Sequence, residues 1–161
     1  MPPALAAALT ARGYAALTPV QSAVLEPEAR GRDLLVSART GSGKTVAYGL
    51  ALGETLLSDA ALGQLAPRAG DPLALIVAPT RELALQVERE LAWLYASAGV
   101  KVVSCVGGMD IRREQRALAQ GAHVVVGTPG RLCDHLKRGY LRVEALASVV
   151  LDEADEMLNM G

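Results

Sequence analysis

The sequence predicts an α/β fold built on a parallel β-sheet with helices on both faces. Short apolar runs alternate with helical patterns along the chain, as they do in proteins made of successive strand–helix–strand units. The runs are continuously apolar, which is typical of strands that are buried on both faces. Glycine-rich and acidic motifs follow several of these runs, at the strand ends where such sheets bind ligands.

The composition is that of a globular domain of 161 residues, long enough to bury a full core. Hydrophobic residues make up 51% of the chain and the net charge is −1, so the sequence is neither disordered nor broadly basic. Aromatic residues make up 3%, which argues against an aromatic stacking platform for nucleic acid. No apolar run approaches membrane-spanning length, and the N-terminus lacks the basic start of a signal peptide. We therefore expect a cytoplasmic protein with no membrane partner.

The N-terminal part of the chain predicts two short helices. Residues 4–12 form a helical pattern that stops at Gly13, a residue type common just past a helix end. Thr18 as N-cap and Pro19 in the first turn begin a second helix that runs toward Glu28. A further proline near its end predicts that this helix stops or bends there.

A glycine-rich loop, Ala38–Thr45 with the sequence ARTGSGKT, joins a predicted first strand at 33–37 to a helix that begins near Lys44 and reaches Leu57. Its glycines allow a tight turn in which successive backbone N–H groups point at one anion, and the helix adds its positive dipole end. The lysine can reach the β- and γ-phosphates, and the threonine hydroxyl can ligate Mg²⁺. The loop therefore predicts a nucleoside triphosphate site; the alternative is a glycine turn that precedes a helix by chance.

The middle of the chain predicts a loop, a strand and a long helix. Residues 58–72 are rich in glycine and proline, which indicates a loop. Residues 73–77 predict the second strand, and residues 81–97 a long helix because leucine and valine recur there at helical spacing. Trp93 and Tyr95 flank that apolar stripe, and we interpret them as packing residues.

The C-terminal part continues the alternation of strands and helices. We expect strands at 101–105, 123–126 and 147–151, helices at 111–120 and 128–138, and a turn at Gly107–Gly108.

Two adjacent carboxylates, Asp152 and Glu153, follow the last predicted strand. Asp152 can hold Mg²⁺ through water, and Glu153 can polarise an attacking water as general base. Because a phosphate loop needs groups that hold the metal and orient the water, we interpret this pair, with Lys44, as catalytic. The alternative is an acidic helix start, since carboxylates favour helix N-termini.

The cysteines and histidines do not have the spacing of a metal site. Cys105 and Cys133 form no C-x-x-C pair, so we interpret them as buried free thiols in a reducing compartment. His123 and His135 are interpreted as core or surface residues.

Together and in this order, the motifs resemble those of the DEAD-box ATP-dependent RNA helicases. The acidic tetrad Asp152–Asp155 and the phosphate loop match the family, including the alanine that begins the loop. The stretch 13–21 is similar to the Q motif, 78–84 to motif Ia, and 128–131 to motif Ib, while Gly107–Gly108 resembles the family's GG pair. The resemblance covers nearly the whole chain.

The resemblance implies that the cofactors are ATP and Mg²⁺, with the metal held by Thr45 and Asp152. Gln21 is implied to read the adenine edge, a task that suits an amide because it both donates and accepts hydrogen bonds. In one respect the chain departs from the family, because Ala4 stands where an aromatic residue usually stacks on adenine. The residues implied to bind nucleotide are Tyr14, Gln21, Thr40, Gly41, Ser42, Gly43, Lys44 and Thr45.

The resemblance also implies a path for single-stranded or duplex RNA. Hydroxyls, arginines and glycine N–H groups can contact phosphates and sugars without reading bases. Taken singly, each arginine is equally compatible with a solvated or helix-capping role. The residues implied to line the path are Pro79, Thr80, Arg81, Gly108, Thr128 and Arg131.

The same resemblance implies the domain organisation. Residues 1–161 are identified as an N-terminal RecA-like helicase ATP-binding domain with a Q-motif region at 1–22. A C-terminal RecA-like domain of the same protein is expected to supply arginine fingers and the other half of the RNA groove, and Asp155 to link the nucleotide site to the coupling between domains. Residues 1–161 alone are expected to be monomeric and weakly active.

Two other functions stay open at this point. The phosphate loop and the acid pair fit equally well a P-loop ATPase that acts on DNA or remodels another substrate, although Gln21, the stretch 128–131 and the full tetrad Asp152–Asp155 argue against it. The other alternative is a non-catalytic nucleotide- or RNA-binding module, which the intact phosphate loop and acid pair disfavour.

Overall fold

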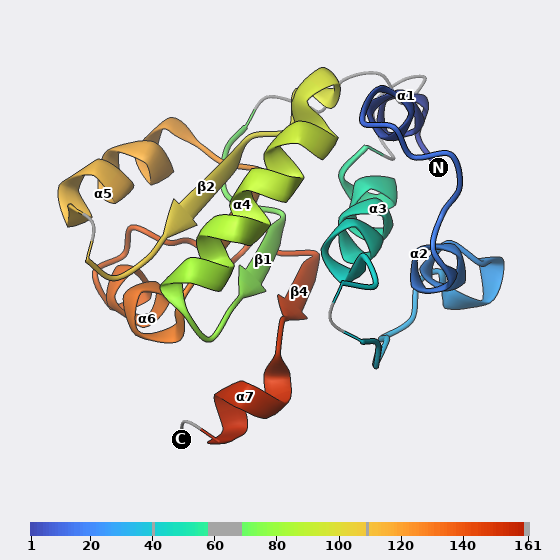
Figure 1. Ribbon diagram of the computed structural model, residues 1–161. Helices are drawn as coiled ribbons and strands as arrows, with labels where there is room; N and C mark the ends of the chain where they lie inside the picture. The colour runs from blue at the N-terminus through green and yellow to red at the C-terminus, as the bar shows by residue number, and fades with distance from the viewer. Residues whose placement is uncertain (40, 58–68, 109, 160–161) are drawn as a thin grey trace. The chain divides into compact units, whose positions relative to one another are not determined.

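The structure, a computed structural model, describes residues 1–39, 41–57, 69–108 and 110–159 (Figure 1). The chain forms two compact units. One comprises Met1–Pro67 and Trp93–Gly99, and the other comprises Arg68–Ala92 and Val100–Gly161. Most of the loop predicted at 58–72 lies outside the described residues, which resume at position 69.

The first unit is made of helices and irregular segments. The predicted helices are confirmed, and Gly13 has the left-handed φ of 88° expected just after the first one. The second helix ends sooner than predicted, and Pro27 begins a separate short 3₁₀ turn instead. Among the described residues, the helical elements of this unit are α1 (Pro3–Ala11), α2 (Pro19–Val24), η1 (Pro27–Ala29), α3 (Lys44–Leu56) and η3 (Ala96–Ala98).

The two aromatic residues at the end of the long helix do pack within this unit, as predicted. Tyr95 is fully buried, and its hydroxyl donates a hydrogen bond of 2.6 Å to the backbone oxygen of Gly49. The Trp93 ring lies 6.0 Å from the ring of Tyr14, and the guanidinium of Arg12 lies 5.1 Å above it. The buried hydroxyl ties the end of the long helix to α3.

The prediction of a strand at 33–37 is wrong. Residues 33–39 have no regular structure, and Leu35 is 99% exposed. An apolar run becomes a strand only where a neighbouring strand pairs with its backbone. Every strand of the described sheet lies in the other unit, so this run has no strand beside it among the described residues of its own unit. The phosphate loop is therefore reached through irregular backbone.

The second unit contains a parallel sheet of four strands in the order β2-β3-β1-β4. Figure 1 labels β2, β1 and β4 of this sheet. All four lie within one residue of a predicted strand. β3 is buried along its whole length because it has a neighbour on each side and is covered on both faces. The strands are β1 (Ala74–Val77), β2 (Val102–Cys105), β3 (Val124–Gly127) and β4 (Ser148–Leu151).

Helices cover both faces of this sheet, which confirms the predicted fold class. α4 (Arg81–Tyr95) crosses one face, while α5 (Ile111–Gln120) and α6 (Pro129–Lys137) pack on the other (Figure 1), as right-handed crossovers require. On the face toward α5 and α6, buried side chains form a hydrophobic cluster that includes Val103 and Val125. α7 (Ala154–Asn159) follows β4. Within the described part of the chain, no helix combines the length and apolar character needed to cross a membrane.

The buried tyrosine provides a test of this packing. Tyr95→Phe removes the hydroxyl, so the backbone carbonyl of Gly49 loses the hydrogen bond that it accepts from Tyr95. The free energy of unfolding should therefore fall by about 1–2 kcal/mol. Tyr140→Phe, at an exposed tyrosine, is the matched control and should change it by less than about 0.5 kcal/mol. Urea denaturation of the two variants measures the difference, and equal effects would contradict the buried hydrogen bond.

Candidate functional site

The phosphate loop has the backbone geometry that an anion site needs. Gly41 and Gly43 have φ values of 79° and 83°, a left-handed conformation that other residues adopt at a steric cost. Gly43 is the N-cap of α3, and no side chain caps the helix from that position. Lys44 and Thr45 form its first turn. The positive end of a helix dipole therefore follows directly on the turn, which favours a bound phosphate.

Gln21 is buried against this loop. Its side-chain nitrogen donates a hydrogen bond of 3.3 Å to the backbone oxygen of Gly43, and its side-chain oxygen accepts one of 3.0 Å from the backbone N–H of Thr18. The Thr18 hydroxyl accepts in return from the Gln21 backbone, which completes a capping box at the start of α2. A Cβ atom on Gly43 would collide with the Gln21 amide. The glutamine thus holds the phosphate loop directly, a contact that the sequence did not predict.

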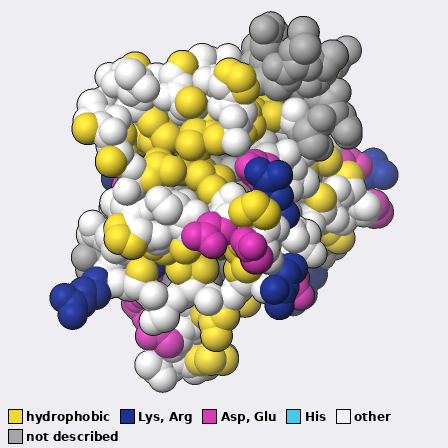
Figure 2. All heavy atoms as spheres, turned by 90° about the vertical axis from the view of Figure 1, so that its right-hand side faces the viewer, with side chains coloured by type: hydrophobic (Ala, Val, Ile, Leu, Met, Phe, Trp, Pro, Cys, Tyr) yellow, Lys and Arg dark blue, Asp and Glu magenta, His cyan; other side chains and the backbone are white. Residues whose placement is uncertain are grey.

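A hollow of about 770 Å³ lies beside the loop, within the size range of small-molecule sites. Residues along α2 and its N-cap, Ala29, the run 34–39 and Ser42 line it, and its walls are mostly apolar. The Ser42 hydroxyl oxygen is buried and has no hydrogen-bond partner in the described part of the chain. This hydroxyl is therefore suited to form a hydrogen bond with a polar ligand in the hollow. Hydrophobic side chains are widely exposed on the face shown in Figure 2. Tyr14 and Gln21 are not among the lining residues, and Thr40 lies outside the described residues.

The acid pair follows β4 in the second unit, whereas the phosphate loop belongs to the first. The backbone N–H of Asp152 donates 2.9 Å to the oxygen of Val77, which continues the ladder between β4 and β1, and its side chain is buried. Glu153 has a φ of 51°, the only left-handed value among described residues other than glycine. Such strain costs about 1–2 kcal/mol and is found disproportionately at functional sites. Asp155 is exposed in the first turn of α7.

The segments that follow β1 and β2 approach each other closely. After β1, buried Pro79 precedes Thr80, whose hydroxyl caps α4 by accepting 3.2 Å from the N–H of Leu83. After β2, Gly108 has a φ of 81°, and a Cβ atom there would lie 2.5 Å from a guanidinium nitrogen of Arg81. Two residues that were predicted to line the RNA path are thus brought together.

The segment that follows β3 lies at the same end of the sheet. The backbone N–H of Thr128 donates 3.2 Å to the oxygen of Cys105, the last residue of β2. Thr128 is the N-cap of α6, but its side chain makes no capping hydrogen bond. Arg131, in the first turn of α6, pairs with Glu114 at 3.0 Å. The predicted RNA-path residues therefore come from three neighbouring strand ends.

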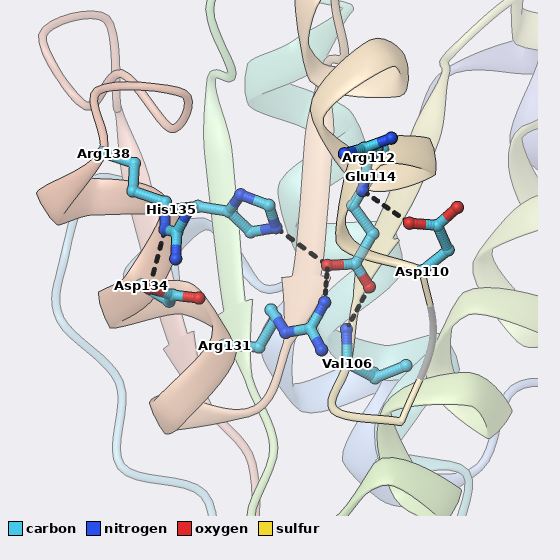
Figure 3. A network of polar contacts seen from close by, with 8 residues as sticks. All are labelled: Val106, Asp110, Arg112, Glu114, Arg131, Asp134, His135 and Arg138. Carbon is cyan, nitrogen blue, oxygen red and sulfur yellow. Dashed lines mark hydrogen bonds and ion pairs between the residues drawn. The ribbon is translucent and has the colours of Figure 1, made fainter.

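Glu114 is a buried carboxylate that the sequence did not predict as functional. One of its oxygens accepts 3.0 Å from Arg131 and lies 2.8 Å from Nε2 of His135, and the other accepts 2.8 Å from the backbone N–H of Val106 (Figure 3). Because an ionised carboxylate only accepts, His135 donates through Nε2. The sequence offered no signal, since a single glutamate among the charged residues of α5 is typical of a solvated face.

The same cluster contains Cys105, whose sulfur lies within 4.8 Å of the ligand atoms of Glu114 and His135. Both oxygens of Glu114 are already engaged by donors. Burial, and then the nearby charge of Glu114, raise the pKa of the Cys105 thiol to about 12, which disfavours the thiolate that a metal would need. The cluster is therefore a hydrogen-bond network. The cysteines are free as predicted, but Cys133 is exposed, so its predicted burial is wrong.

Comparison with known proteins identifies the family. A sequence model described as DEAD/DEAH box helicase matches residues 18–161. The chain belongs to that family.

Curated relatives of this DEAD/DEAH box domain are much longer proteins. The chain is 45% identical to the DEAD-box ATP-dependent RNA helicase CshA of Geobacillus kaustophilus, over 96% of the chain and 31% of that protein. It is 46% identical to the DEAD-box ATP-dependent RNA helicase 53 of Oryza sativa subsp. japonica, over 95% of the chain and 24% of that protein. The chain therefore spans less than a third of the length of these relatives.

A solved structure shares the fold of this DEAD/DEAH box domain. The crystal structure of a hypothetical ATP-dependent RNA helicase from Sulfolobus tokodaii matches with a TM-score of 0.85 at 32% identity. The match covers 100% of this chain and 44% of that one. It confirms the predicted RecA-like fold.

The two adjacent glycines after β2 provide a matched pair of variants. Gly108→Ala should lower the free energy of unfolding by about 1–2 kcal/mol, because its left-handed backbone and the guanidinium of Arg81 both oppose a side chain. A Cβ atom on Gly107 would meet nothing within 4 Å, so Gly107→Ala should change it by less than about 0.5 kcal/mol. Chemical denaturation of both variants measures this, and a larger loss for Gly107→Ala would refute the geometry.

Proposed function

We propose that this chain is the ATP-binding part of an ATP-dependent RNA helicase, which hydrolyses ATP as it binds RNA and opens short duplexes locally. The observation that carries the proposal is the family match over residues 18–161. The names of its relatives support it. So does the phosphate loop, whose left-handed glycines precede a helix N-terminus.

In this proposal the nucleotide is held mainly by the phosphate loop. The backbone N–H groups of residues 41–45 bind the phosphates, and Lys44 contributes its positive charge to the β- and γ-phosphates. Thr45 and Asp152 would hold Mg²⁺, which would neutralise charge that develops on the phosphates. Glu153 takes a proton from the attacking water as general base. Gln21 recognises the adenine edge while it holds Gly43 in place.

RNA is bound at the ends of the first three strands. Arg81 and Arg131 supply positive charge, Thr80 and Thr128 supply hydroxyls, and Gly108 exposes its backbone to the ligand. Pro79 shapes the segment that precedes them. These groups suit phosphates and sugars, so binding is expected to depend little on RNA sequence.

The rest of the mechanism needs a second domain. A C-terminal RecA-like domain supplies the cations that complete in-line phosphoryl transfer, and exposed Asp155 couples the nucleotide site to it. Residues 1–161 alone then bind ATP as a monomer and hydrolyse it slowly. We place the intact protein in the cytoplasm.

Glu153→Gln in the full-length protein tests the chemistry and the substrate together. ATP turnover should be stimulated by single-stranded RNA and little by single-stranded DNA, and the variant should lose at least about a hundredfold in turnover because it cannot take a proton. Glu156→Gln, at an exposed glutamate of α7, is the matched control and should turn over normally. Stimulation by DNA equal to that by RNA would contradict the proposal that RNA is the substrate. An active Glu153→Gln variant would contradict the proposal that Glu153 is the general base.

Gln21→Glu tests adenine recognition separately from support of the loop. The carboxylate can still accept from Thr18 but no longer donates, so we expect ATP binding to weaken about tenfold and the preference for ATP over GTP to narrow. Titration of the full-length protein with ATP and GTP measures both quantities, with Gln86→Glu at an exposed position as the control. An equal loss for the two nucleotides would show that Gln21 supports the loop without reading the base.

A further inference from the structure

Glu114 receives donors from two segments that are distant in sequence from each other. It lies on α5, and the Val106 backbone N–H that it binds is directly followed by the Gly107–Gly108 turn. Its other two donors, Arg131 and His135, belong to α6 (Figure 3). One carboxylate therefore connects the turn after β2 to the helix after β3.

This connection is more than space filling. Glu114 is 5% exposed, and a buried carboxylate is costly unless donors satisfy it. An apolar side chain of similar volume would fill the same space without that cost. The carboxylate also fixes where its donors lie, because each of its hydrogen bonds requires its donor at a defined distance and angle.

The donors that it holds belong to segments assigned above to RNA binding. The guanidinium of Arg131 is held through one of its nitrogens at 3.0 Å, which fixes the plane in which its remaining N–H groups lie. The amide bond to Val106 fixes the backbone at the start of the glycine turn. Neither contact brings Glu114 itself to the ligand, since its carboxylate is buried.

We propose that Glu114 is a positioning residue for RNA binding, which holds Arg131 and the Gly107–Gly108 turn in one arrangement so that both meet the same stretch of RNA backbone. The proposal rests on the proposed function, because it presumes that these segments bind RNA. It assigns to Glu114 no part in ATP hydrolysis.

Glu114→Gln in the full-length protein is the primary test. Glutamine keeps the size of the side chain but offers one acceptor oxygen where three donors need two. We expect the KM for single-stranded RNA in RNA-stimulated ATP turnover to rise about tenfold. The KM for ATP and the turnover without RNA should stay within about twofold, because the fold and the nucleotide site are intact.

A double-variant cycle shows whether Glu114 acts through Arg131. Arg131→Gln alone should also raise the KM for RNA. If Glu114 positions Arg131, the combined variant should raise it by clearly less than the product of the two single effects. A full product would show that the two residues act independently, and would overturn the proposal.

His123→Leu controls for a general loss of stability. His123 is buried in the same unit, and its Nδ1 accepts 2.8 Å from the backbone N–H of Lys101 at the opposite end of the sheet. At a similar loss of thermal stability, this variant should keep the KM for RNA of the parent protein. A rise like that of Glu114→Gln would show that stability alone explains both, and the proposal would fall.

The outcomes separate this proposal from the proposed function. A parent protein that RNA does not stimulate would refute the proposed function and the role of Glu114 with it. A parent protein that RNA stimulates, with an unchanged KM for RNA in Glu114→Gln, would refute the role of Glu114 alone.

Discussion

The hydrogen-bond ladder that β3 shares with β1 on one side and β2 on the other determines where the segments that follow these strands lie. The strands pair in parallel and nearly in register, so Val77, Cys105 and Gly127 end at the same level of the sheet. The three segments that follow must leave the sheet together. Arg81 can approach Gly108, and Thr128 can bond to Cys105, only because this ladder aligns the strands from which they emerge.

Much of this arrangement could be predicted because its signals are local. Thr18 and Gln21 form a capping box over four consecutive residues, and the continuous valines of β3 indicate a strand buried on both faces. Gly43 and Gly108 occupy left-handed backbone where side chains are disfavoured. Motifs built from such constraints can be recognised from the residues alone.

What could not be predicted depends on contacts between distant residues. The run 33–37 carries the same apolar signal as β3, yet it forms no strand, because pairing depends on a neighbour that the run itself does not specify. Cys133 was assigned to the core from the average behaviour of cysteine, although it lies on an exposed side of α6. Glu114 was overlooked for the converse reason, since its charge suggests solvent while its three donors come from elsewhere in the chain.

At Glu153 the left-handed backbone opposes stability to the role as general base that we propose for its carboxylate. Glycine adopts that conformation without steric cost, so a sequence optimised for stability alone would carry glycine there. Retaining a carboxylate instead leaves the chain less stable than its fold allows, and selection for activity can maintain such a choice. The proposed role of Glu153 therefore implies that the most stable form of this domain and its most active form are different sequences.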